Sequence, residues 1–176
     1  MRNKYLLSDI LNVFGIIIIG LITAIFIYPF LHEGAHLITA FIFRADIKEF
    51  CLLPTPYVVC NTANLSNIKQ SIIGLSGMTF PPIMALIITK RWFWSWYIRF
   101  LILGISLLAF LISAFTLILP QGFELNPQDD IIQVINLYKG VKEILVTAIL
   151  ILCVVIVVCI ILDKPLEILY RRFNIK

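Results

Sequence analysis

Charged residues are scarce in this chain, and histidine is scarcer still. Lys, Arg, Asp and Glu make up 14% of the 176 residues, whereas 61% are hydrophobic, and the mean hydropathy is +1.01. A soluble domain is typically about half apolar and about a quarter charged. The composition therefore excludes an ordinary soluble fold and predicts an integral membrane protein, with the lipid bilayer as its surroundings.

Internal repeats, low-complexity linkers and basic stripes are also lacking. The net charge of +4 comes from lysines and arginines near the ends of apolar runs, which is typical of anchoring at the membrane interface. No basic surface with interleaved aromatic residues is evident, so we expect no nucleic-acid partner. The length provides for about four to six crossings of about 20 residues each, so residues 1–176 should form a single membrane domain.

Four apolar runs are long enough to cross a bilayer core of about 30 Å: residues 10–28, 71–89, 98–119 and 141–162. Pro29 is expected to break or kink the chain after the first run, leaving a shorter helix over residues 30–43. Residues 44–70 are more polar, with β-branched and aromatic residues around two prolines, which predicts a small re-entrant or strand-like hairpin. The predicted fold class is an all-α polytopic bundle of about four full transmembrane helices plus the shorter helix.

The basic residues predict an orientation. The positive-inside rule places three pairs in the cytoplasm: Arg2 with Lys4, Lys90 with Arg91, and Arg171 with Arg172. Both termini are then cytoplasmic in a multi-pass protein of the cell membrane, and the acidic connection over residues 121–143 lies outside. The segment 30–70 must accordingly enter and return rather than cross.

The only two histidines, His32 and His36, belong to the one motif that carries chemistry, His-Glu-Gly-Ala-His. Four residues apart on a helix, they share one face and can chelate a single Zn²⁺, while Glu33 can act as a base toward water. Charged groups in an apolar helix cost about 2.5–3.5 kcal/mol each on insertion scales, which metal binding would offset. The alternative is a buried polar cluster that only hydrogen-bonds neighbouring helices.

A third zinc ligand must come from elsewhere, because catalytic zinc normally has three protein ligands and the chain has no third histidine. Asp129 and Asp130 are the leading candidates, since they follow a predicted membrane helix on the same side as the motif. Either aspartate also suits an ordinary helix start, where acids complement the helix dipole. Glu124 is a further candidate, and the weaker candidates are Glu49 and Asp46.

Cysteine is also sparse, with four residues in the chain. Cys153 and Cys159 lie within an apolar run, where packing is the expected role. Cys51 and Cys60 flank the two prolines of the predicted hairpin, which would permit a disulfide if that loop faces an oxidising side.

In these motifs the chain resembles the site-2 protease group of intramembrane zinc metalloproteases. His-Glu-Gly-Ala-His matches the first family motif in full. Residues 75–81 are similar to the small-residue Gly-Pro…Asn motif of the next helix, although Met78 and Pro81 stand where the family has proline and asparagine. Residues 117–120, followed by Asp129 and Asp130, are similar to the Asn-Leu-Leu-Pro…Leu-Asp-Gly region.

The resemblance implies a membrane-embedded zinc metalloprotease that hydrolyses a peptide bond of a membrane-associated peptide or protein, within or next to the membrane. Glu33 would be the catalytic base, and His32, His36 and one of the two aspartates would be the metal ligands, with a slight preference for Asp130 over Asp129. The rival hypothesis is a non-proteolytic protein, either zinc-binding or metal-free, that acts as an interaction, immunity or regulatory module.

Overall fold

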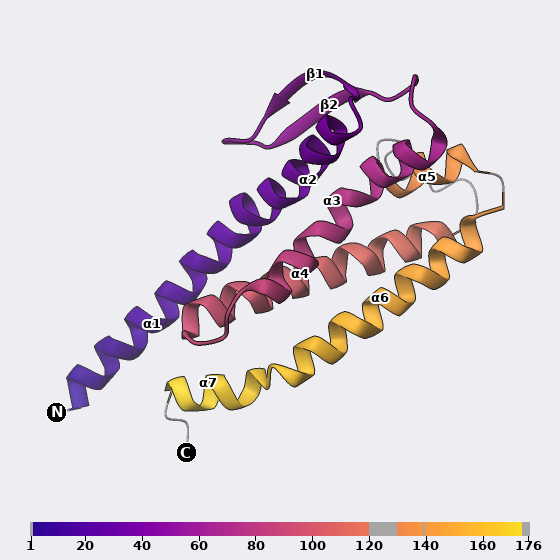
Figure 1. Ribbon diagram of the computed structural model, residues 1–176. Helices are drawn as coiled ribbons and strands as arrows, with labels where there is room; N and C mark the ends of the chain where they lie inside the picture. The colour runs from indigo at the N-terminus through magenta and orange to yellow at the C-terminus, as the bar shows by residue number, and fades with distance from the viewer. Residues whose placement is uncertain (1, 120–129, 139, 174–176) are drawn as a thin grey trace.

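The computed structural model describes residues 2–119, 130–138 and 140–173 (Figure 1). A short π-helical segment, Thr23–Ile27, joins the first two helices. The other elements are α1 (Arg2–Ile22), α2 (Tyr28–Ile42), β1 (Asp46–Cys51), β2 (Tyr57–Asn61), α3 (Asn67–Ile87), α4 (Phe93–Ile118), α5 (Asp130–Leu137), α6 (Lys142–Leu162) and α7 (Pro165–Phe173). A mostly helical chain with one small sheet confirms the predicted class in outline.

Four helical stretches in the described residues are long and apolar enough to cross a membrane. They are Ile10–Ile42, Asn67–Ile87, Phe93–Ile118 and Lys142–Arg172. Large apolar side chains on α1 and α6 are exposed, among them Phe14 and Val154. Such surfaces are rare on soluble monomers, and they suit helices in contact with lipid.

The predicted break at Pro29 is wrong, because α1, the π-helical segment and α2 form one continuous helix. The amide of Tyr28 bonds the carbonyl of Thr23, five residues back, so the turn in front of the proline is wider than an α-turn. A proline ring inside an α-helix clashes with the carbonyl four residues earlier. A π-turn at this point relieves that clash, and the histidine motif lies in the C-terminal part of the first long helix.

The long helices run alternately up and down (Figure 1). Both chain ends and the α3–α4 connection lie at one end of the molecule, whereas the β-hairpin and α5 lie at the other. Arg172 at the end of α7 donates to Asn12 Oδ1 of α1 at 2.6 Å and lies over the ring of Phe93. The basic residues of the α3–α4 turn and of α7 thus meet at one end, as their sequence positions predicted.

The core lies between α3, α4, α5 and α6, and includes Ile102, Leu103, Phe110, Ile131 and Ile149. Helix α2 packs along α3, and α5 packs on the opposite end of α3 from the α3–α4 turn. Helix α3 is therefore the element that both α2 and α5 contact.

The hairpin is an antiparallel pair whose register runs from Asp46 opposite Asn61 to Cys51 opposite Tyr57. It confirms the strand-like prediction for this segment. Cys60 lies opposite Ile47, so the two hairpin cysteines are several residues apart along the ladder and on opposite faces of the sheet. Both thiols are free, and the disulfide considered for them is not formed.

A buried ionic cluster joins three helices at the end that holds the termini. Arg99 Nε of α4 donates to Asp163 Oδ2 at the end of α6 at 2.7 Å, and Lys90 pairs with the other carboxylate oxygen. Arg99 Nη1 also donates to the carbonyls of Ala85 and Leu86 at 2.9 Å each. These carbonyls lie in the last turn of α3, where a helix leaves most carbonyls without an internal partner, although the Ala85 carbonyl also accepts from the Ile88 amide at 3.3 Å. The cluster therefore fixes α3, α4 and α6 relative to one another.

We expect Arg99→Leu to lower the free energy of unfolding by about 3 kcal/mol or more, because it leaves the buried Asp163 carboxylate with one ionic partner and removes a hydrogen bond from each of two helix-end carbonyls. Arg91→Leu, which removes an exposed arginine eight residues earlier, is the matched control and should change little. Denaturant unfolding in detergent micelles measures both. Equal effects of the two variants would contradict a stabilising role for the cluster.

Candidate metal centre

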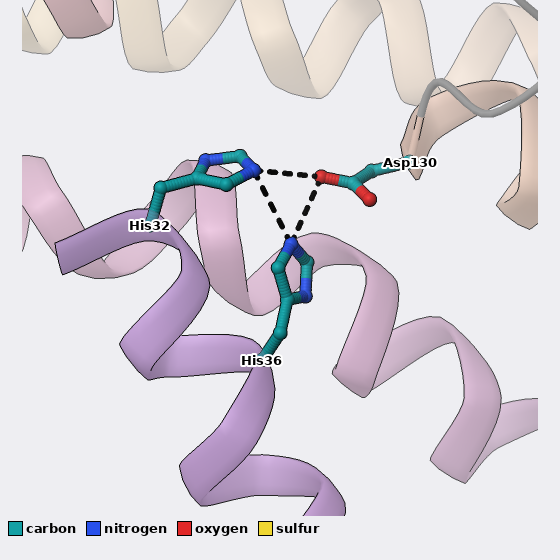
Figure 2. A group of neighbouring side chains, drawn as sticks. All are labelled: His32, His36 and Asp130. Carbon is teal, nitrogen blue, oxygen red and sulfur yellow. Dashed lines mark hydrogen bonds and ion pairs between the residues drawn. The ribbon is translucent and has the colours of Figure 1, made fainter. Parts of the chain in front are cut away.

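Three potential ligand atoms converge between α2 and α5 (Figure 2). His36 Nε2 lies 3.3 Å from His32 Nε2 and 3.2 Å from Asp130 Oδ2, and His32 Nε2 lies 3.3 Å from the same carboxylate oxygen. The three residues are the one group of three or more His, Cys, Asp or Glu side chains in the described part of the chain with metal-ligand spacing. The two histidines lie on one face of α2, as their spacing predicted.

The spacing of these atoms fits a tetrahedral zinc ion. Ligand atoms about 2.0–2.1 Å from a tetrahedral centre lie about 3.3 Å from one another, which is the spacing found. Two imidazole nitrogens and one carboxylate oxygen are also a donor set that zinc accepts in catalytic sites, where three protein ligands leave one position open. His32, His36 and Asp130 are therefore the residues that could hold the metal.

The orientation of His36 is set by α3. Its Nδ1 donates to the carbonyl of Ile73 at 2.7 Å, which leaves the Nε2 lone pair directed at the candidate centre. Ser76 Oγ donates to the same carbonyl at 2.7 Å and lies 3.0 Å from Thr39 Oγ1. His36 is buried, so these contacts between α2 and α3 hold its ring in one position.

Two glycines of α3 allow this close approach. A Cβ at Gly77 would collide with His36 Nε2 and lie 2.8 Å from His32 Nε2. A Cβ at Gly74 would lie 3.3 Å from Val134 Cγ2 and 3.5 Å from the Asp130 carbonyl. Motif reasoning missed both roles. The available signal was the spacing of three residues, which places the two glycines on one face of the helix.

Asp130 is the first residue of α5, next to the histidines. Burial raises the pKa of its carboxyl, but hydrogen bonds to His32 and His36 and the charges of those rings outweigh burial and lower the pKa from 3.8 to about 2. The group is thus a carboxylate at neutral pH, which is the form that binds metal.

The two predicted ligands on the hairpin, Asp46 and Glu49, are not brought to this centre. Asp46 pairs with Lys48, and Glu49 accepts a hydrogen bond from Tyr57, both on the hairpin. Asp129 and Glu124 lie outside the described residues.

A cleft of about 670 Å³ opens onto the candidate centre. Glu33 lines it together with His36 and Asp130, so the predicted base shares the space beside the ligands. Glu33 is half-buried, and its carboxylate has no hydrogen-bond partner within the described residues. The remaining lining residues are Tyr57, Val58, Val59, Cys60, Thr62, Gln70, Ile73, Gly74, Gln133, Val134, Asn136 and Leu137.

The cleft runs along the edge of β2. Four consecutive residues of this strand line it, although successive side chains of a strand point to opposite faces. The shared feature of consecutive residues is the backbone edge, and β1 occupies the other edge of β2. The edge of β2 that pairs with no strand in the described residues therefore faces the cleft.

Comparison of the chain with protein-family models, curated proteins and solved structures finds no match.

We expect Gly77→Ala to weaken zinc binding by about tenfold or more, the range seen when groups that orient ligands are disturbed. Alanine in a helix otherwise favours the helix by about 1 kcal/mol over glycine, so weaker binding would report the collision with the histidines. Gly104→Ala on α4 is the matched control, because no atom lies within 4 Å of its added Cβ. Zinc titration of the purified variants measures the affinities, and equal affinities would contradict the close approach.

The two candidate aspartates can be separated directly. Asp130→Asn is expected to abolish stoichiometric zinc, since a neutral amide replaces the ionised ligand, whereas Asp129→Asn should keep it. Metal analysis of the purified proteins by mass spectrometry gives the zinc content. If only the Asp129 variant loses zinc, the third ligand is Asp129 and not Asp130.

Proposed function

We propose that this chain is a membrane-embedded zinc metalloprotease, similar to the site-2 protease group, which hydrolyses a peptide bond within or next to the membrane. The observation that carries the proposal is the convergence of His32, His36 and Asp130 at ligand spacing, with Glu33 in the same cleft. The histidine motif predicts this chemistry from the sequence alone, and the position of Asp130 beside the histidines supports it as the third ligand.

In this proposal His32, His36 and Asp130 hold the metal. Zinc, when bound, supplies a Lewis acid that lowers the pKa of water toward about 7 and polarises the scissile carbonyl. Glu33 takes the proton from the attacking water and then gives it to the leaving amine. Ile73 keeps the proton of His36 on Nδ1, so that Nε2 stays available as a ligand.

The substrate in this proposal binds as an extended strand along β2. The cleft leads from the unpaired edge of β2 to Glu33 and the ligands. An exposed strand edge offers backbone donors and acceptors to a peptide, which gives affinity without fixing the peptide's sequence. A peptide bond in a helix has its carbonyl hydrogen-bonded within the helix, so pairing with β2 would also hold the substrate unwound.

The proposal places the centre near the outer face of the cell membrane, with both termini in the cytoplasm. The first helical stretch has 33 residues and is about 50 Å long, which exceeds a core of about 30 Å. Its motif-bearing part lies at the end opposite the basic residues of the α3–α4 turn and α7. The four long helices then form a polytopic bundle, and the hairpin returns on the outer side.

We expect Glu33→Gln to keep stoichiometric zinc and to lower peptide hydrolysis by about 10²–10⁴-fold, the usual contribution of a general base. Glu143→Gln, at an exposed position in the first turn of α6, is the matched control and should change neither property. His36→Ala should lose both zinc and hydrolysis. Zinc content and cleavage of a fluorogenic peptide library measure the two properties.

The same variant tests the non-proteolytic alternative. If Glu33→Gln restores the phenotype of a strain lacking this chain as fully as the unaltered protein does, the base is dispensable and the protease proposal fails. Zinc that is absent from the unaltered protein would contradict the metal centre itself.

A further inference from the structure

One of the two histidine ligands has no hydrogen bond that sets the direction of its ring. His36 donates from Nδ1 to the Ile73 carbonyl at 2.7 Å. In the described ranges, the polar contacts of His32 are made by Nε2, with His36 and Asp130, and its Nδ1 points away from the candidate centre (Figure 2). Histidines that bind metals usually donate from the second ring nitrogen to a fixed acceptor. Among the described residues, the direction of the His32 ring therefore comes from packing.

The ring of Tyr28 lies one turn before His32 on the same face of α2. The two ring centroids are 6.5 Å apart and the ring planes are tilted by 28°, which is a stacked arrangement. Aromatic rings attract one another at centroid distances of about 4.5–7 Å. Because side chains of a helix lean toward its N-terminus, the His32 ring is directed over the turn that carries Tyr28. Beyond it, His32 meets His36 edge-on, with the centroids 4.9 Å apart, so it lies between two rings of one helix face.

Tyr28 is itself held in place by the bundle. Its side chain packs against the core that α3, α4, α5 and α6 form. Its amide bonds the Thr23 carbonyl across the π-turn, so that turn fixes the point from which the ring leaves the helix. The Tyr28 hydroxyl lies beside Ser106 of α4, whose Oγ has no hydrogen-bond partner in the part of the chain that is described. The flat ring, and not a hydrogen bond of the hydroxyl, is thus the part of Tyr28 that acts on the histidine.

We propose that Tyr28 is a positioning residue of the metal centre, which by ring stacking holds the His32 imidazole with Nε2 toward the other ligands. The inference rests on the metal centre of the proposed function, because it concerns a ligand of that metal. Rotation about the Cβ–Cγ bond of histidine is only weakly restricted by the side chain itself. Without the tyrosine ring, the imidazole can therefore turn away from the geometry that the centre requires.

The test measures metal binding by the full chain in detergent micelles and does not require hydrolysis. Tyr28→Leu removes the ring, and Tyr28→Phe keeps it. Phe26→Leu is the matched control, because it makes the same aromatic-to-leucine change at an exposed position of the same continuous helix. Zinc titration gives the affinity. The visible absorption of Co²⁺-loaded protein reports the ligand geometry, since these bands weaken when cobalt gains ligands beyond four.

We expect Tyr28→Leu to bind zinc about three- to tenfold more weakly, which is the size of an aromatic pair contribution. It should also absorb less visible light per bound Co²⁺. Tyr28→Phe should match the unaltered protein in both measurements, because the stacked ring remains, and Phe26→Leu should match it too. If Tyr28→Leu does not fold, Tyr28→Met gives the same comparison with a longer non-aromatic side chain.

A cobalt spectrum that is unchanged in the non-aromatic variants would overturn the inference, even if denaturant unfolding shows the zinc-free proteins to be less stable, because Tyr28 would then serve packing alone. An equal loss of affinity in Tyr28→Phe or in Phe26→Leu would overturn it as well. Absence of metal from the unaltered protein would contradict the metal centre and with it both proposals. Bound metal without hydrolysis would contradict the proposed function and leave the role of Tyr28 standing.

Discussion

The absence of a side chain at one point on α3 is the constraint on which the candidate centre depends. Gly77 lies where the two histidine rings of α2 reach α3, and even a methyl group there would collide with them. One turn earlier, Gly74 lets α5 approach. Because these glycines are three residues apart, one face of α3 admits ligands from two elements that are 94 residues apart in sequence.

The two ends of the bundle provide partners for their buried polar groups in different ways. In an apolar surrounding every polar group needs a partner. At the end with the termini, Arg99 and Lys90 both pair with the Asp163 carboxylate, and Arg99 also donates to the last carbonyls of α3. At the opposite end, the Ile73 carbonyl, Ser76 and Thr39 satisfy one another and His36 Nδ1, while the three ligand atoms face one another. The first arrangement is closed, whereas the second leaves ligand atoms beside an open cleft.

The sequence predicted what depends on local periodicity. Helical spacing put His32 and His36 on one face, run length gave the four apolar helices, and β-branched residues gave the hairpin. The sequence favoured Asp130 over its neighbour Asp129 only slightly, and it is the packing of α5 on α3 that brings the Asp130 carboxylate to the histidines. The partner of His36 Nδ1 could not be found from a motif. It is a backbone carbonyl, which every residue has, so residue identity gives no sign of which carbonyl lies nearby. The pairing considered for Cys51 and Cys60 failed because register, and not proximity in sequence, decides which strand residues meet.

Pro29 perturbs the helix, as its sequence position predicted, but it does so without ending the helix. The proline does disturb the helix, but the chain responds with a π-turn over Thr23–Ile27 instead of a break. That turn holds one extra residue, which adds no rotation about the helix axis. In an uninterrupted α-helix, the side-chain directions of Gly20 and His36 would be about 160° apart around the axis, whereas with the extra residue they are about 60° apart. Gly20 lies against Tyr97 of α4, and His36 lies against α3. The π-turn therefore lets one continuous helix direct both its inner contact and its histidines toward the same side of the bundle, which a helix without it could not do.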